Sequence, residues 1–141
     1  MQTFLPSASY AETARVLDYK RLGKQRVECK QILLAMGKTS GGWVNHPATK
    51  MWRGHEIELC RYAMTICGEW ISRGYNDNLL PFFTKALYDY QSDGRTEEPP
   101  PWLGDERIHA SHRSNLLRKD ISYYKQFGWV EPDNLGYVWP V

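Results

Sequence analysis

The sequence has few cysteines, and no pattern makes them ligands or disulfide partners. Cys29, Cys60 and Cys67 are the three, and they form no CxxC pair. Neither a zinc ribbon nor a disulfide framework is therefore indicated. Cys60 and Cys67 lie two helical turns apart, which predicts two core positions. No apolar run is long enough to span a bilayer, and the N-terminus has no signal-peptide pattern, so we expect a soluble protein with reduced thiols in the cytoplasm.

Common catalytic and cofactor motifs are absent too. No Ser-His-Asp order, zinc signature or pair of carboxylates stands out in the sequence. Residues 37–39 (Gly-Lys-Thr) lack the upstream glycine and the preceding strand of a P-loop, so nucleotide hydrolysis is not indicated. His46 and His55 have no accompanying Asp or Cys ligands, and we expect them in a loop and in helix packing. The sequence therefore predicts neither a metal nor a cofactor.

The net charge of +2, from 18 basic and 16 acidic residues, conceals a separation of charge along the chain. Residues 86–106 contain six acids and one base, Arg95. The basic residues are therefore concentrated elsewhere, as a nucleic-acid-binding surface requires. The six Trp and nine Tyr are also numerous; such side chains fill cores and stack on bases.

Residues 15–38 contain seven cations and only two carboxylates, Asp18 and Glu28. The cations at positions 20, 21 and 24 fall on one exposed helical strip, which is unfavourable unless a polyanion neutralises it. Glu28 is then either a salt-bridge partner or a carboxylate in a cationic, phosphate-binding site. The seven cations are Arg15, Lys20, Arg21, Lys24, Arg26, Lys30 and Lys38. The expected buried stripe is Val16, Leu17, Leu22, Val27, Ile32, Leu33 and Met36.

The helical patterns predict an all-α fold: a compact single-domain bundle of three to four main helices spanning residues 1–141, with an aromatic C-terminal tail. Ser9 and Glu12 have capping-box spacing, so a helix begins at Ser9; the pattern leaves open whether it continues unbroken to residue 36. A long central helix is expected over 47–73, and shorter ones over 79–90 and 105–119. Gly23 is either a tolerated kink or a point where a phosphate approaches bare backbone.

Several side chains are candidates for contacts with DNA. Trp52 and Arg53 lie off the apolar stripe of the central helix, and the last helix places His109 and His112 on its expected surface. The tail after it is either docked on the core or forms a stacking edge, with Tyr124 the more buried tyrosine. The DNA-binding candidates are Lys20, Arg21, Lys24, Arg26, Trp52, Arg53, His112, Arg113, Arg118, Lys119, Tyr123, Tyr124 and Lys125.

A chain terminus beside Glu28 would supply the missing chemistry. α-Amines in general have a pKa near 7.7–8.0, so a part is unprotonated at pH 7 and acts as a nucleophile. Attack on a deoxyribose C1′ expels the base and leaves an imine, which permits strand scission by β-elimination. A nearby carboxylate would stabilise the cationic sugar and move protons.

Three stretches, in order, resemble the pyrimidine-dimer DNA glycosylase/AP lyases of the phage endonuclease V type. They are Leu17-Asp18 with the basic helix that contains Glu28, residues 55–76, and residues 108–128. The resemblance implies a helical fold and removal of cyclobutane dimers without a metal, followed by strand cleavage. It also implies an N-terminal amine as nucleophile and bent double-stranded DNA with a base flipped out. A monomer in a prokaryotic or phage-infected cell is expected.

The sequence departs from that family at three points, one of which is a longer spacing from the N-terminus to Glu28. The best-known member loses its initiator methionine and exposes a small second residue, whereas Gln2 is bulky here. We therefore expect Met1 to be retained and its own amine to serve beside Glu28. The basic residue that often precedes the glutamate is Val27 here, and Arg26 is one position earlier. Two alternatives stay open: a non-catalytic DNA-binding protein on this scaffold, or a glycosylase for another modified base.

Overall fold

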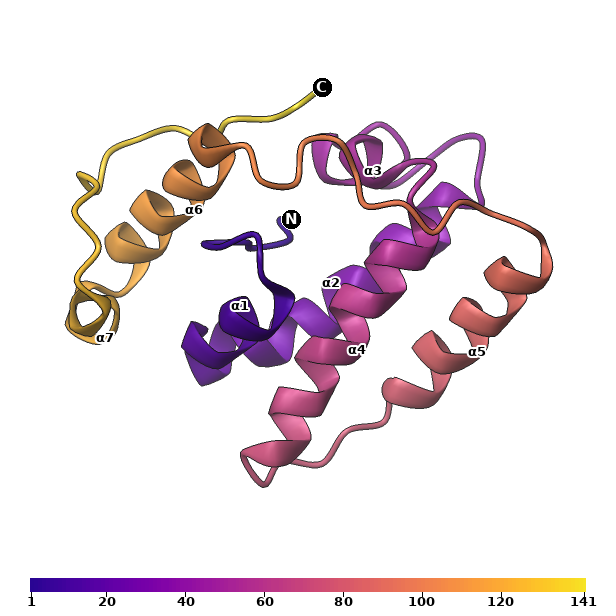
Figure 1. Ribbon diagram of the computed structural model, residues 1–141, viewed down its shortest axis with the longest axis horizontal. Coiled ribbons are helices and arrows are strands. Elements are labelled where there is room, and N and C mark those ends of the chain that lie inside the picture. Colours follow the sequence, from indigo (N-terminus) through magenta and orange to yellow (C-terminus); the bar gives the residue numbers. More distant parts are fainter.

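The computed structural model comprises residues 1–141 and is helical throughout, which confirms the all-α class (Figure 1). It contains no strand, and none of its helices combines the length and apolar character that crossing a membrane requires. The seven α-helices and one 3₁₀ turn are α1 (Tyr10–Val16), α2 (Tyr19–Met36), α3 (Pro47–Trp52), α4 (Glu56–Ser72), α5 (Leu80–Ser92), α6 (Glu106–Lys119), α7 (Ile121–Tyr124) and η1 (Lys125–Phe127).

The helix that begins after Ser9 does not continue unbroken to residue 36: it is interrupted between α1 and α2. Ser9 caps α1 as predicted, because its hydroxyl accepts the Glu12 N–H at 3.1 Å. Leu17 and Asp18 then adopt extended backbone. Leu17 is fully buried, and the Asp18 N–H donates to the Tyr124 hydroxyl at 3.0 Å. The break therefore buries an apolar side chain and leaves the backbone hydrogen-bonded.

The predicted long helix over 47–73 is wrong, because the structure divides it into α3 and α4. Pro47 does start α3, capped by the His46 ring, which accepts the Ala48 N–H at 3.0 Å. The helix ends at Trp52, and Gly54 has a φ of +86°, a left-handed conformation that glycine adopts readily. α4 then starts at Glu56, whose carboxylate accepts the Gly54 N–H.

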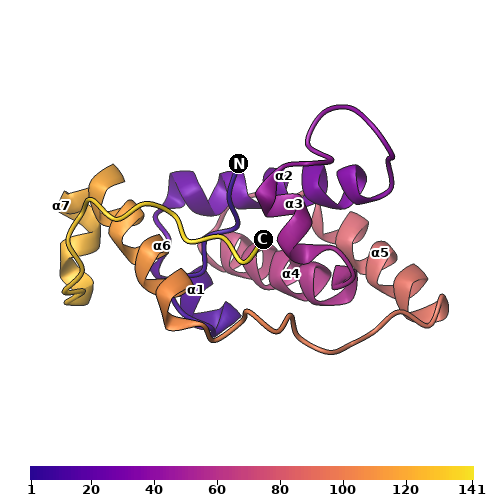
Figure 2. The ribbon, with the colours of Figure 1, turned by 90° about the horizontal axis from the view of Figure 1, so that it is seen from above.

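The core lies where α2 and α4 pack along one another, with α5 on the outer side of α4 (Figures 1 and 2). Cys60 and Cys67 are fully buried in this core, as predicted. The prediction that Val27 belongs to the buried stripe is wrong, since this residue is 46 % exposed. Gly23 has a packing role: a Cβ there would lie 2.8 Å from the Trp70 ring, so close packing of two helices requires the glycine.

The extended N-terminal segment, residues 2–5, is buried and is bound on both sides. The Leu5 N–H donates to His112 Nδ1 at 2.9 Å, and its carbonyl oxygen lies 2.8 Å from His109 Nδ1. On the other side, Trp52 Nε1 donates to the Thr3 hydroxyl at 2.9 Å. The predicted surface positions of His109, His112 and Trp52 are therefore wrong. Each is at most 2 % exposed, because each hydrogen-bonds this segment.

The C-terminal tail, residues 129–141, runs along α6 back toward the N-terminus (Figure 2). Small polar side chains on α6 hold it: Ser111 Oγ accepts the Val138 N–H at 3.1 Å, and Ser114 Oγ accepts the Leu135 N–H at 3.0 Å. Both serines are buried. Ser111 and Ser114 of α6 therefore bind the tail, and this brings Tyr137 beside Phe4 of the N-terminal segment.

Candidate active site

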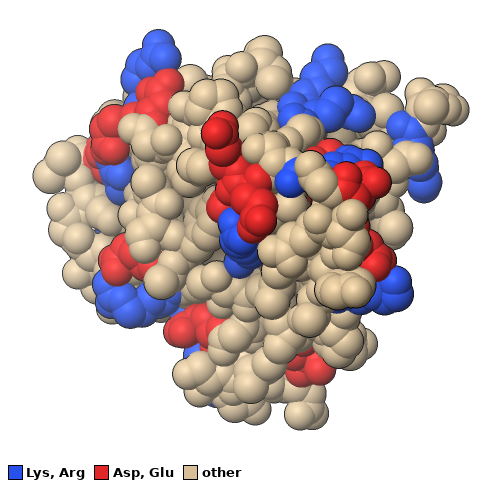
Figure 3. All heavy atoms as spheres, turned by 45° about the vertical axis from the view of Figure 1, so that its right-hand side comes forward, with Lys and Arg blue, Asp and Glu red and all other residues tan.

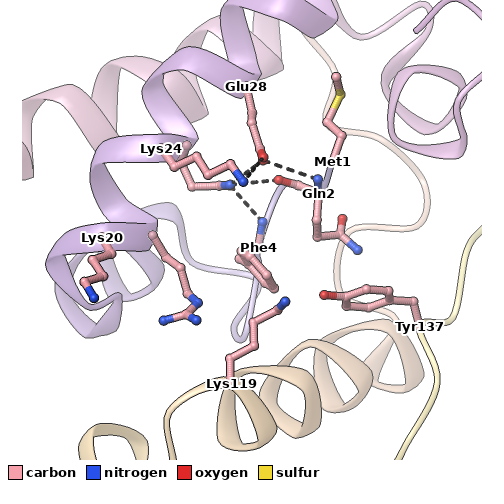
Figure 4. Close-up of a pocket in the computed structure, with 10 residues that line it drawn as sticks. Met1, Gln2, Phe4, Lys20, Lys24, Glu28, Lys119 and Tyr137 are labelled. Carbon is pink, nitrogen blue, oxygen red and sulfur yellow. Dashed lines mark hydrogen bonds and ion pairs between the residues drawn. The ribbon is translucent and has the colours of Figure 1, made fainter.

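A cavity of about 350 Å³ lies where the N-terminal segment, α2, α6 and the C-terminal tail meet (Figure 4). We call it the N-terminal cavity. Most of its lining side chains are polar or charged, which suits a polar ligand better than an apolar one. Its lining residues are Met1, Gln2, Phe4, Lys20, Arg21, Lys24, Gln25, Glu28, Lys119 and Tyr137.

Glu28 is the carboxylate of the cavity, and it is 8 % exposed. Its Oε2 accepts the Gln2 backbone N–H at 3.3 Å, and Lys24 Nζ lies 3.7 Å from Oε1. Because Gln2 directly follows Met1, this bond holds Met1 at the wall of the same cavity as the carboxylate (Figure 4). The structure thus brings together the two catalytic candidates, which are 27 positions apart in the sequence.

Gln25 links Glu28, the N-terminal segment and α4 through both ends of its carboxamide. Its Nε2 donates to Glu28 Oε2 at 3.0 Å and to the Gln2 carbonyl oxygen at 2.8 Å. Its Oε1 accepts the Phe4 N–H at 2.9 Å and the Tyr62 hydroxyl at 2.8 Å. Gln25 is 1 % exposed. A buried amide with all these bonds fixes the N-terminal segment against α2 and orients the carboxylate.

Positive charge surrounds the mouth of the cavity. Lys20 and Lys24 are exposed, and Arg21 is paired with Asp18 at 3.1 Å. The pKa of Lys119 is lowered, first by partial burial and then by its cationic neighbours, chiefly Arg21. Cations that disfavour each other's charge favour an anion between them, and DNA phosphate is such an anion.

The face that carries α5 has a different charge pattern. Acidic and basic side chains lie next to one another there (Figure 3). Lys85 is paired with Asp89 at 2.7 Å, and Arg95 with Glu56 at 3.0 Å. This face includes the acidic stretch identified in the sequence, and Lys85 and Arg95 on it are already paired with carboxylates. It offers a polyanion much less than the mouth of the N-terminal cavity does.

Four of the DNA-binding candidates are buried, so the prediction that they lie on the surface is wrong. Trp52 and His112 bind the N-terminal segment, as described above. Arg26 donates to Asp77 at 2.7 Å and lies 4.9 Å from the Trp70 ring centroid. Tyr124 is fully buried, as the more buried of the two tyrosines, and its hydroxyl donates to Asp18. These side chains have their partners inside the protein, so contact with DNA would require them to leave the core.

The other candidates are accessible in different degrees. Arg113 is half-buried: it is ion-paired with Glu106 and Glu131, and it donates to the Pro6 carbonyl oxygen at 2.8 Å. Tyr123 is also half-buried, and its ring packs on Tyr124. Their contacts with DNA stay predictions. The exposed candidates are Lys20, Lys24, Arg53, Arg118, Lys119 and Lys125.

A family model described as pyrimidine dimer DNA glycosylase matches residues 1–80. The match covers more than half of the chain and includes both Met1 and Glu28. The chain belongs to this family. No curated protein and no solved structure matches it. The protein is thus a DNA repair glycosylase by family, and DNA binding follows from that membership.

Several residues that line the N-terminal cavity were not predicted from the sequence. Gln25 did leave a signal, since it is a polar residue on the buried side of α2, three positions before Glu28. Gln2, Phe4 and Tyr137 left none, because only the folded chain brings both ends together. No group of three or more His, Cys, Asp or Glu side chains is arranged to hold a metal ion.

Proposed function

We propose that this pyrimidine dimer DNA glycosylase removes a damaged pyrimidine through an imine on the α-amine of Met1, and then cleaves the abasic strand as a lyase. The substrate is a cyclobutane dimer in double-stranded DNA. One observation carries the proposal: the buried Glu28 carboxylate binds the Gln2 N–H, so that Met1 and the carboxylate line one cavity. Proximity of this kind is what nucleophilic catalysis requires.

The proposed steps follow from these two groups. The amine lone pair attacks C1′ as the N-glycosidic bond breaks; the pyrimidine keeps the bonding electrons, takes a proton from solvent and stays joined to its neighbour through the cyclobutane ring. Opening of the sugar ring leaves a protonated imine. Glu28 stabilises the cationic sugar, passes the proton released by the amine to the ring oxygen as the sugar opens, and can then accept the proton from C2′. Loss of the C2′ proton expels the 3′ phosphate by β-elimination, and water then hydrolyses the imine and frees Met1.

The DNA is held by its phosphates at the mouth of the cavity. Lys20, Lys24 and Lys119 are exposed there, close to the carboxylate. A base can reach a nucleophile inside a cavity only when it leaves the helical stack, so the DNA is bent and the nucleotide is turned out. We further propose that the protein acts as a monomer, in the cytoplasm of a prokaryotic or phage-infected cell.

Borohydride trapping with duplex DNA that contains an abasic site tests the mechanism. An enzyme that forms an imine is captured as a covalent adduct, and mass spectrometry of its peptides should locate the adduct on Met1. Acetylation of the α-amine should abolish trapping. A protein that binds DNA without catalysis would give no adduct, whereas trapping without release of dimers would indicate a glycosylase for another base.

Glu28→Gln tests the carboxylate. The amide keeps the size but loses the charge, so the rate of cleavage of the N-glycosidic bond should fall by about 10²- to 10⁴-fold. DNA affinity should hold or rise, because a negative charge has left a cationic surface. Glu12→Gln is the matched control, since Glu12 pairs only with Arg15 on the surface of α1 and such pairs contribute little. Full activity of Glu28→Gln would refute the assignment.

A further inference from the structure

A second surface cavity, of about 130 Å³, lies at the C-terminal end of α2, beside the loop of residues 37–46 that leads to α3. Figure 2 shows this loop, in purple, projecting beyond α2 on the side where the N-terminus lies. Two large apolar side chains of the cavity are exposed, Leu34 by 49 % and Trp43 by 44 %. Lys38 lines the same cavity and is exposed. The protein therefore presents an aromatic ring, an aliphatic side chain and a cation together at its surface.

A single row of side chains, which we call the α2 stripe, connects this cavity to the mouth of the N-terminal cavity. Apart from Tyr19, every exposed residue of α2 belongs to it, and Lys38 continues the spacing just after the helix. Steps of four and three residues keep the stripe on one side of the helix. It contains no carboxylate, because Glu28, the only acid of α2, lines the N-terminal cavity instead. The stripe consists of Lys20, Lys24, Val27, Gln31, Leu34 and Lys38.

Aromatic contacts fix the loop close to the proposed catalytic groups. The ring centroid of Trp43 lies 5.3 Å from that of His46, which lies 5.9 Å from that of Trp139. Trp139 in turn lies 5.7 Å from Tyr137, which lines the N-terminal cavity. Burial lowers the pKa of His46, and the positive charge of the Met1 α-amine lowers it further. The loop and the amine therefore belong to the same side of the molecule.

The chemistry of the α2 stripe fits the backbone of a DNA duplex. Lysines bind phosphates, and apolar side chains suit the deoxyribose between them. The bases of a paired duplex are stacked on one another, so Trp43 would meet sugars and not base faces. A second copy of the stripe is a poor partner, because an interface between two identical surfaces would bring lysines together at both ends. The stripe also continues directly from the cations at the mouth of the N-terminal cavity.

We propose that Leu34, Lys38 and Trp43 form a second contact with the duplex, on one flank of the lesion, with Lys38 on a phosphate and the two apolar side chains on the neighbouring deoxyribose. This inference rests on the proposed function, which places the lesion at the N-terminal cavity, and it adds the course of the flanking DNA. The helix rises about 21 Å between Lys24 and Lys38, a length of about six base pairs. The stripe thus predicts a footprint that extends about that far on one side.

Duplexes with a non-cleavable abasic-site analogue and flanks of different length test this contact. One duplex has about twelve base pairs on each side of the analogue, and two others are shortened to about three base pairs on the 5′ or on the 3′ side. Fluorescence anisotropy measures Kd for each. Shortening the flank that reaches the stripe should weaken binding of the wild-type protein by about tenfold, and more than shortening the other flank does.

Two variants remove the contact from the protein side. Trp43→Ala and Lys38→Gln should each raise Kd for the long duplex by about three- to tenfold. Neither should change Kd for the duplex that lacks the contacted flank, because the partner of the side chain is already absent. Lys38→Gln should also reduce the slope of log Kobs against log salt by about 0.9, on the long duplex only. Tyr88→Ala and Lys85→Gln are the matched controls, since both residues are exposed on α5, and they should change no Kd.

The outcomes distinguish the inference from the function beneath it. Equal losses on all three duplexes would mean that the substitutions disturb the fold of the site, and no loss on any duplex would mean that this surface does not contact DNA. A change in sedimentation without a change in Kd would assign the surface to self-association. Each of these results overturns the inference and leaves the proposed function standing. A wild-type protein that releases no base from dimers and forms no borohydride adduct would refute the proposed function, whereas the flank measurements concern binding alone.

Discussion

Gln25→Met should separate the positioning of the catalytic groups from DNA binding. Methionine has nearly the same length and also favours a helix, but it forms none of the four hydrogen bonds. The Phe4 N–H and the Gln2 carbonyl oxygen would then lose their bonds to α2. Tyr62 would keep its bond to the Phe4 carbonyl oxygen at 2.6 Å, so its hydroxyl would stay satisfied.

The expected loss of stability follows from those two backbone groups. Each buried group without a partner is unfavourable by about 1–3 kcal/mol, and water from the cavity can satisfy part of the need near Gln2. We therefore expect the free energy of unfolding to fall by about 2–4 kcal/mol. For a chain of this size, that lowers the melting temperature by about 10 °C. Most natural proteins of this size tolerate such a loss and remain folded at 25 °C.

The catalytic effect should be larger than the effect on binding. A misplacement of about 1 Å between reacting groups is worth about 10²-fold in rate, so base release by Gln25→Met should fall by about that factor. The Kd for duplex DNA should hold, because the exposed lysines are untouched. Gln31→Met is the matched control: it makes the same change six positions later on α2, at an exposed site. Wild-type base release by a clearly destabilised Gln25→Met would refute the positioning role.

The remaining predictions concern charge, packing and pH. Lys20→Gln and Lys24→Gln should each reduce the slope of log Kobs against log salt by about 0.9, whereas Lys85→Gln on α5 should not; salt titrations of DNA affinity check this. Gly23→Ala gains about 1 kcal/mol of helix propensity, but its methyl group would meet the Trp70 ring, which is stacked on Tyr75 at 4.2 Å. Since overpacking usually opposes folding by about 1–3 kcal/mol, urea unfolding should show a net loss. Burial lowers the pKa of His112 from 6.5 to about 3. Between these pH values His112 is protonated in the unfolded chain and neutral in the folded chain. Stability should therefore fall as the pH drops from 6.5 toward 3, by up to about 1.4 kcal/mol per pH unit, and less steeply in His112→Gln.

The sequence predicted the parts of the fold that depend on local signals. The cap at Ser9, the start of α3 at Pro47 and the all-α class each follow from residues that act within a few positions. The division between α3 and α4 was missed, although Gly54 marks it, because an apolar stripe alone does not reveal a left-handed residue. His112 was misplaced for another reason: its partner, Leu5, is more than a hundred positions away.

For the proposed catalytic pair, too, the sequence identified the residues but not the contacts that bring them together. Glu28 stood out as a lone carboxylate in a basic helix, and the amine was proposed from chemistry. Their shared cavity depends on Gln25, whose four bonds reach residues at three separate places in the chain. Such a network has no sequence pattern of its own, so a polar residue on the buried side of an amphipathic helix is the only indication it leaves.

The two halves of the chain contribute different parts of one site. Residues 1–80 contain both proposed catalytic groups, yet the N-terminal segment that carries the amine is not held by those residues alone. The Leu5 N–H and carbonyl oxygen both face histidines of α6, so the helix outside the matched region completes the backbone bonds of the segment. α6 also anchors the tail that brings Tyr137 to the cavity. The position of the amine therefore depends physically on α6, and a change in α6 that releases Leu5 should disturb catalysis although it leaves Met1 and Glu28 intact.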